Sequence, residues 1–129
     1  MLGLSVLAWV SGFDIIYACQ DADYDRSAKL RSVPAWLGVP GALRLAAFCH
    51  LVTMILLGLL PVVCPQVRLA WVYGVAVALV AILLIYEHWL VKPNDLSRVN
   101  VAFFNINVII SVGLFVAASI DLLRASFGV

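Results

Sequence analysis

Four long hydrophobic runs, separated by short polar segments, dominate the chain. Each run reaches about 20 residues, the length that an α-helix needs to cross roughly 30 Å of hydrocarbon. Because no water is available there to bond the peptide groups, helices are the favoured way to satisfy the backbone. The pattern predicts an all-α, polytopic transmembrane helical bundle with helices at about residues 2–25, 42–63, 67–90 and 99–123.

The polar connections predict how these helices are oriented. Residues 21–41 are polar and then punctuated by Pro and Gly, which is typical of a functional loop, and VKPNDLSR at residues 91–98 links the last two helices. The connection near Pro65 is very short, so its two helices run antiparallel and both polar loops lie on one side. Six of the eight Lys and Arg residues flank these loops, which favours a cytoplasmic location for both. The six are Arg26, Lys29, Arg31, Arg44, Lys92 and Arg98.

Composition excludes an ordinary soluble domain. The 129 residues are 65% hydrophobic and 12% charged, and the mean hydropathy is +1.11. The net charge of +1, without a basic cluster, argues against a nucleic-acid surface, so no nucleic acid is expected as a partner. The three cysteines share no metal-ligand spacing and are interpreted as small apolar residues. The lipid bilayer is the expected surrounding.

The candidate chemistry lies in residues 14–32, which read DIIYACQDADYDRSAKLRS. This segment holds four of the seven acidic residues of the chain, followed by three basic ones. If it stays helical, Asp14, Asp21 and Asp25 return to within about 20° of one face. Mg²⁺ is usually held by one or two carboxylates together with phosphate oxygens of a substrate. The spacing predicts a metal-bridged phosphate or diphosphate site at the end of a membrane helix.

Two residues of the first helix join this site in the prediction. An ionised carboxylate at Asp14 costs about 3 kcal/mol in the bilayer unless it faces protein or water, so it is expected to face a cavity. Pairing of Asp14 with a neighbouring helix is the alternative. Tyr17 follows one turn later on the same flank. It lines a pocket or anchors the helix at the membrane interface.

The remaining polar residues within the helices have structural interpretations. Asn100, Asn107 and Ser111 recur at i, i+7 and i+11, a stripe that favours hydrogen bonding between helices over ligand binding. His88 lies beside Glu87 with no third ligand at helical spacing. This pair is expected to be polar and interfacial, with metal binding as the weaker alternative.

The segment YACQDADYDRSAKLRS resembles the second aspartate-rich motif of the UbiA superfamily of intramembrane aromatic prenyltransferases. The core of that motif, YxxxDxxxD, corresponds to Tyr17, Asp21 and Asp25. The pair Arg31-Ser32, and the stretch LVKPNDLSRVNVAFFNINVIIS, resemble the 4-hydroxybenzoate polyprenyltransferase branch. One departure is Lys29, which stands where many relatives carry glycine.

The resemblance implies transfer of a polyprenyl group from a polyprenyl diphosphate to an aromatic acceptor such as 4-hydroxybenzoate, for ubiquinone biosynthesis, with Mg²⁺ as cofactor. It implies Asp21 and Asp25 as Mg²⁺ ligands and Asp14 and Tyr17 as catalytic-site residues. The diphosphate-binding residues that it implies are Lys29, Arg31 and Ser32. Two alternatives are a menaquinone-pathway relative acting on a naphthoate- or futalosine-type acceptor and a non-catalytic membrane fragment.

A second departure concerns the first aspartate-rich motif, NxxxDxxxD, which does not occur in this sequence. The family has a nine-helix bundle, and residues 1–129 resemble the C-terminal part of that single transmembrane domain. The missing N-terminal helices, with the first motif, are therefore expected as partners, and the chain alone is expected to be inactive. The resemblance implies an integral protein of a bacterial inner membrane with a cytoplasmic aspartate-rich loop.

Overall fold

The computed structural model describes residues 1–127 and contains helices but no strand in that range. Four helical spans are long and apolar enough to cross a membrane, which confirms the predicted all-α transmembrane bundle. The helices are α1 (Leu2–Ala18), α2 (Ala22–Ser27), α3 (Val33–Val63), α4 (Trp71–Leu90) and α5 (Asn107–Phe127). Three short segments complete the order: the 3₁₀ turns η1 (Cys19–Asp21) and η2 (Pro65–Val67), and the π-helical η3 (Val101–Ile106).

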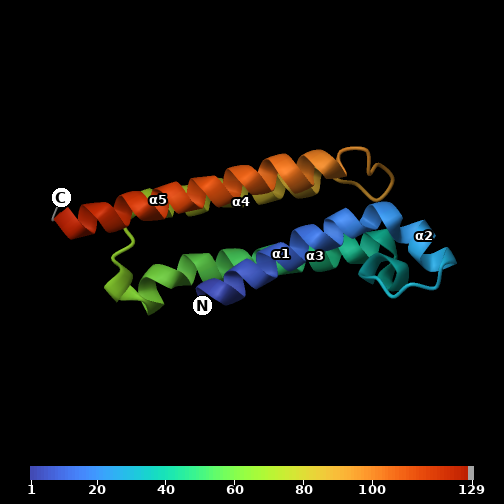
Figure 1. The fold of residues 1–129 in the computed structure, drawn as a ribbon, viewed down its shortest axis with the longest axis horizontal. Helices are drawn as coiled ribbons and strands as arrows, with labels where there is room; N and C mark the ends of the chain where they lie inside the picture. Colours follow the sequence, from blue (N-terminus) through green and yellow to red (C-terminus); the bar gives the residue numbers. More distant parts are fainter. Residues whose placement is uncertain (128–129) are drawn as a thin grey trace.

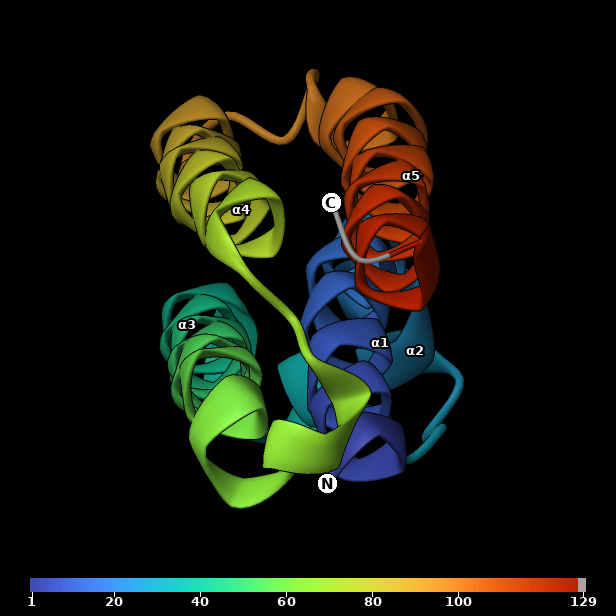
Figure 2. The ribbon, with the colours of Figure 1, turned by 90° about the vertical axis from the view of Figure 1, so that its left-hand side faces the viewer.

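The helices form two layers, with α1 packed along α3 and α4 packed along α5 (Figures 1 and 2). The small segment α2 and the link between α4 and α5 lie at the same end of the bundle (Figure 1). The two polar connections thus share one end, as the antiparallel connectivity predicts. Their cytoplasmic location stays a prediction.

The structure differs from the predicted loop at residues 21–41, because much of this segment is helical. Helix α3 begins at Val33, where the Ser32 hydroxyl oxygen accepts a 3.3 Å hydrogen bond from the Ala35 N–H and satisfies a free donor of the first turn. Gly38 then leaves the helical conformation, with φ 71°, just before Pro40. Glycine tolerates this backbone and the proline cannot continue a hydrogen-bonded turn, so α3 has a kink there.

Small residues lie where α1 meets α3, and large apolar side chains lie outside. Ser5 and Gly12 on α1, with Ala42 and Ala46 on α3, are all buried. Small side chains allow two membrane helices to approach closely. Many large side chains point away from the bundle, among them Phe48, Ile55, Ile82, Trp89 and Phe115. This distribution suits a bundle surrounded by hydrocarbon.

Asp121 of α5 caps the beginning of α4. The side chain is 2% exposed, and its Oδ2 accepts hydrogen bonds of 2.8 Å from the N–H groups of Ala70 and Tyr73. The first N–H groups of a helix have no partner within it, and a negative charge there is favoured by the helix dipole. The cap therefore joins the two helices of one layer.

We expect Asp121→Ala to lower the free energy of unfolding by about 2 kcal/mol, because two N–H groups lose their acceptor. Thermal unfolding of the detergent-solubilised chain, followed by circular dichroism, measures the change. Asp23→Ala is the matched control, since Asp23 is fully exposed. Equal melting temperatures for the two variants would contradict the capping role.

Candidate functional site

The aspartate-rich segment is not one continuous helix. Helix α1 ends at Ala18, η1 follows, and Asp21 stands before α2 with φ −100° and ψ 8°. A 3₁₀ turn has three residues per turn and rotates successive side chains further than an α-helix does. The continuous α-helix on which the predicted shared face of Asp14, Asp21 and Asp25 depends is therefore not present. In residues 1–127 no three His, Cys, Asp or Glu side chains lie close enough to hold a metal ion.

Asp14 and Tyr17 lie on the exposed face of α1, at whose edge Tyr17 contacts η3. Both side chains are exposed, whereas Gly12 and Ile16 on the other face of α1 are buried. The Tyr17 ring lies against Phe103 of η3, with ring centroids 4.4 Å apart. No hydrogen bond or ion pair joins Asp14 to another side chain among the described residues. The alternative that pairs Asp14 with a neighbouring helix thus finds no support within residues 1–127.

The three predicted diphosphate-binding residues come together in the segment that follows α2 and leads into α3. Lys29, Arg31 and Ser32 line one cavity of about 630 Å³, together with Arg26 and Trp36. Three positive side chains thus surround a space at the end of the bundle. Arginine presents a planar fork of donors that matches phosphate oxygens. We call this cavity, lined by Arg26, Lys29, Arg31, Ser32 and Trp36, the basic hollow.

A Schellman turn at the end of α2 shapes the basic hollow. The Leu30 N–H donates to the Asp25 carbonyl at 2.8 Å, and the Lys29 N–H donates to the Arg26 carbonyl at 3.3 Å. Lys29 adopts the left-handed conformation, with φ 55°. Glycine is favoured at this position of the turn, which gives a physical reason why many relatives carry glycine where this chain has Lys29. The lysine keeps the turn at a cost of about 1 kcal/mol and adds a charge to the hollow.

Asp21 and Asp25 lie at the start and middle of α2, the helix that leads into the basic hollow. Asp21 is exposed and Asp25 is partly exposed. Within residues 1–127 neither carboxylate bonds to another side chain, whereas Asp23 pairs with Arg26 at 3.4 Å. Two free carboxylates fit the needs of Mg²⁺, which takes one or two protein carboxylates and completes its shell with water and substrate phosphate oxygens. The residues present thus fit one half of a metal site.

Asp95, in the other polar connection, is engaged in its own turn. One carboxylate oxygen accepts hydrogen bonds from the Ser97 hydroxyl at 2.6 Å and from the Ser97 N–H at 3.1 Å. These bonds, helped by the nearby Arg98 and Lys92 charges, lower the pKa of the Asp95 carboxyl below its usual value. The carboxylate therefore stays ionised at neutral pH and closes the turn that precedes the last helix.

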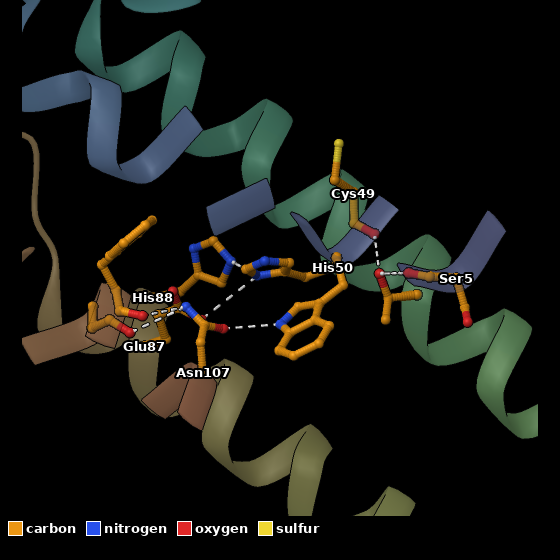
Figure 3. A network of polar contacts seen from close by, with 10 residues as sticks. Ser5, Cys49, His50, Glu87, His88 and Asn107 are labelled. Atoms are coloured by element: carbon orange, nitrogen blue, oxygen red, sulfur yellow. Dashed lines mark hydrogen bonds and ion pairs between the residues drawn. The ribbon is translucent and has the colours of Figure 1, made fainter. Parts of the chain in front are cut away.

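Glu87 and His88, which were expected to be polar and interfacial, lie inside the bundle and not on its surface. Glu87 is completely buried, and His88 Nε2 lies 2.9 Å from Nδ1 of His50, which is 3% exposed (Figure 3). Sequence reasoning missed His50 altogether. The sequence did contain a signal for the burial of Glu87, because this residue continues a row of inward-facing side chains of α4 at helical spacing. The row contains Tyr73, Ala76, Val80, Leu84 and Glu87.

The predicted stripe of Asn100, Asn107 and Ser111 is broken. Asn107 (labelled in Figure 3) is buried and accepts a 2.9 Å hydrogen bond from the Trp9 indole N–H. Asn100 and Ser111 are exposed. For Asn100 the cause is η3, since a π-helix closes its hydrogen bonds over five residues and shifts the register of the helix after it. Ser111 follows Asn107 within α5, so η3 does not account for its exposure. Hydrogen bonding between helices is thus confirmed for Asn107 alone.

Part of the chain is similar in sequence to known proteins. It is 33% identical over 73 residues to two lycopene elongase/hydratases, both from Corynebacterium glutamicum. The aligned part is 57% of this chain and 23% of either relative, so the chain spans about a quarter of their length. No solved structure matches the chain significantly. The UbiA prenyltransferase family matches residues 1–109, and the chain therefore belongs to that family.

Proposed function

We propose that this chain carries the diphosphate-binding part of a Mg²⁺-dependent prenyltransferase. The donor is a polyprenyl diphosphate and the acceptor an aromatic compound such as 4-hydroxybenzoate, which leads to a quinone. The observation that carries the proposal is the basic hollow behind α2, a helix whose carboxylates Asp21 and Asp25 are free. Family membership supports prenyl transfer in general.

Each residue then has a chemical role. Lys29, Arg31 and Ser32 bind the diphosphate, and Asp21 and Asp25 hold Mg²⁺. Bound there, Mg²⁺ would neutralise the charge that develops on the departing diphosphate. Asp14 and Tyr17, exposed on α1, would line the space in which the prenyl group meets its acceptor once further helices cover them. Their open face on α1 is where the N-terminal helices of the family, with the first aspartate-rich motif, would pack.

A specific observation favours a second acceptor class. Both curated relatives are lycopene elongase/hydratases, which points to a polyene as the compound that receives the prenyl group. The aromatic acceptor rests on the likeness of Arg31-Ser32 and of residues 90–111 to the 4-hydroxybenzoate branch. A naphthoate- or futalosine-type acceptor of the menaquinone pathway is the further alternative. Residues that recognise the acceptor would lie largely on helices outside this chain.

The exposed apolar faces of α1, α3, α4 and α5 support a location in a lipid bilayer, where these helices would also receive the prenyl tail. We further propose the bacterial inner membrane, with α2 and the α4–α5 link in the cytoplasm. The excess of Lys and Arg at these two connections supports that orientation.

Binding of farnesyl diphosphate to the chain in lipid nanodiscs tests the proposal. We expect saturable binding by isothermal titration calorimetry with Mg²⁺ and loss of that binding with EDTA. Because charge-assisted hydrogen bonds contribute about 1.5–3 kcal/mol each, Arg31→Gln should weaken binding about tenfold or more. Arg124→Gln is the matched control, since Arg124 lies in the last turn of α5. Binding unaffected by EDTA and by Arg31→Gln would overturn the proposal.

A further inference from the structure

A second polar centre lies inside the bundle, formed by His50 of α3 and by Glu87 and His88 of α4 (Figure 3). His50 Nδ1 is 2.9 Å from His88 Nε2 and 4.0 Å from Glu87 Oε2. His50 also packs against Gly12 of α1. Gly12 belongs to the buried face of α1, opposite the exposed face that carries Asp14 and Tyr17. This centre is therefore separate from the proposed prenyl diphosphate site.

The centre is buried and incompletely satisfied. Glu87 is 0% exposed and His50 3% exposed. Both carboxylate oxygens of Glu87 and Nε2 of His50 have no hydrogen-bond partner within residues 1–127. A buried polar atom without a partner costs free energy, and a buried, unpaired charge costs considerably more. The protons of the cluster must therefore be arranged to limit its net charge.

The contact between the two histidines constrains those protons. A 2.9 Å contact between ring nitrogens is a hydrogen bond, so one nitrogen carries a proton and the other accepts it. Two neutral imidazoles satisfy this requirement, and so does one imidazolium beside one neutral ring. Two imidazolium rings do not, because both would present N–H groups to each other.

Neighbouring groups do not offset a charge on the cluster. Within residues 1–127 no Lys or Arg nitrogen lies within 4.0 Å of a Glu87 oxygen. Around it, α1 contributes Trp9 and Gly12 and α5 contributes Asn107, none of which titrates near neutral pH. With no acidic proton the cluster has a net charge of −1, with one it is neutral, and with two it has a net charge of +1. The neutral state is the one that burial favours.

We propose that His50, Glu87 and His88 form an intramembrane proton-binding site that retains one proton across the physiological pH range. The proton lies on Glu87, or passes to the histidine pair to form an ion pair with it. His88 is the least buried member and connects the site to its surroundings. Because His50 belongs to α3 and Glu87 to α4, the ion pair that forms when the proton is on His50 joins the two layers of the bundle.

Nuclear magnetic resonance can count this proton directly. Glu87 is the only glutamate of the sequence, and His50 and His88 are its only histidines. Labelling glutamate with ¹³C and histidine with ¹⁵N, in the whole chain in nanodiscs, thus gives signals from the proposed site alone. From about pH 5 to pH 8, a range that spans the ordinary histidine transition, we expect the sum of carboxylic acid and imidazolium to stay at one.

Two variants distinguish the contribution of Glu87 to the retained proton from that of His50. In Glu87→Gln no carboxylate is left to offset the positive charge of an imidazolium, so we expect both imidazoles to be neutral at pH 7. In His50→Gln we expect the Glu87 signal to be that of the protonated acid. Asp23→Asn, which alters a fully exposed carboxylate, should leave all three signals unchanged. The number of protons counted in the wild-type chain tests the proposal even where a variant does not fold.

The proposal is overturned by a Glu87 carboxylate beside two neutral imidazoles at neutral pH. It is equally overturned by independent titration of the three groups at the values of free side chains. These readouts require no prenyl transfer, so they are independent of the proposed enzymatic function.

Discussion

Replacing Asp21 and Asp25 together by asparagine is expected to reduce prenyl transfer at least 100-fold in the enzyme that contains this chain and the N-terminal helices of the family. Asparagine keeps the size of the side chain but removes the negative charge that a hard cation requires. Loss of metal stabilisation of the leaving diphosphate then raises the barrier by about 3 kcal/mol or more. The prenylated product is measured by mass spectrometry in membranes supplied with farnesyl diphosphate.

Asp23→Asn is the control for this double substitution. Asp23 lies in α2 between the two proposed ligands but is fully exposed and pairs with Arg26. We expect its activity to stay within about twofold of the wild type, because an exposed pair of this kind contributes little. Undiminished transfer by the double variant would rule out a metal role for Asp21 and Asp25.

The same assay identifies the acceptor. Offered in parallel, 4-hydroxybenzoate, a hydroxynaphthoate and lycopene represent the proposed acceptor and two of its competitors. A product from 4-hydroxybenzoate alone supports the quinone assignment, whereas a product from lycopene alone assigns the chain to the function named for its relatives in Corynebacterium glutamicum. Absence of any product, with wild-type diphosphate binding intact, would favour the non-catalytic alternative.

Hydrophobic runs predicted the number and type of the membrane helices because the requirement for about 20 apolar residues is local and strict. The same reasoning did not place the helix ends in residues 21–41. Pro34 and Gly38 look like loop residues in sequence, yet Pro34 fits the first turn of α3 and Gly38 only bends it. Whether such a residue ends a helix depends on the packing around it.

Irregular helical turns explain why two periodic patterns failed. Asp14 and Asp21 are in phase only along a continuous α-helix, and η1 lies between them. Asn100 and Asn107 are likewise separated by the π-helical η3. Both patterns assumed about 100° of rotation per residue, and no sequence signal marked the turns that depart from it.

The basic hollow was predictable from local sequence, whereas the buried centre was not. Arg26, Lys29 and Arg31 are neighbours in the chain, so any tight turn brings them together. His50 and His88 lie 38 residues apart, on helices of different layers. Only the three-dimensional packing makes them partners.

Gly12→Ala is expected to lower the free energy of unfolding by about 2 kcal/mol, although alanine favours a helix by about 1 kcal/mol over glycine. The new Cβ would overlap the His50 ring, which packs directly on the Gly12 backbone. Unfolding of the chain in mixed micelles measures the change. Gly3→Ala is the matched control on the same helix, because a Cβ at Gly3 meets no atom within 4 Å. A loss of stability common to both variants would contradict this explanation.

A double-mutant cycle of Gly12→Ala and His50→Ala identifies the origin of the expected loss of stability. His50→Ala removes the ring that the added methyl group meets, so Gly12→Ala should cost almost nothing in that background. If the cost instead persists, the methyl group disturbs the packing of the α1 and α3 backbones and not the buried centre. The ring of His50 cannot move freely to make room, since its Nδ1 is bonded to His88 of the other layer. Gly12 is therefore expected to be the point at which α1 fixes the position of the proton-binding site.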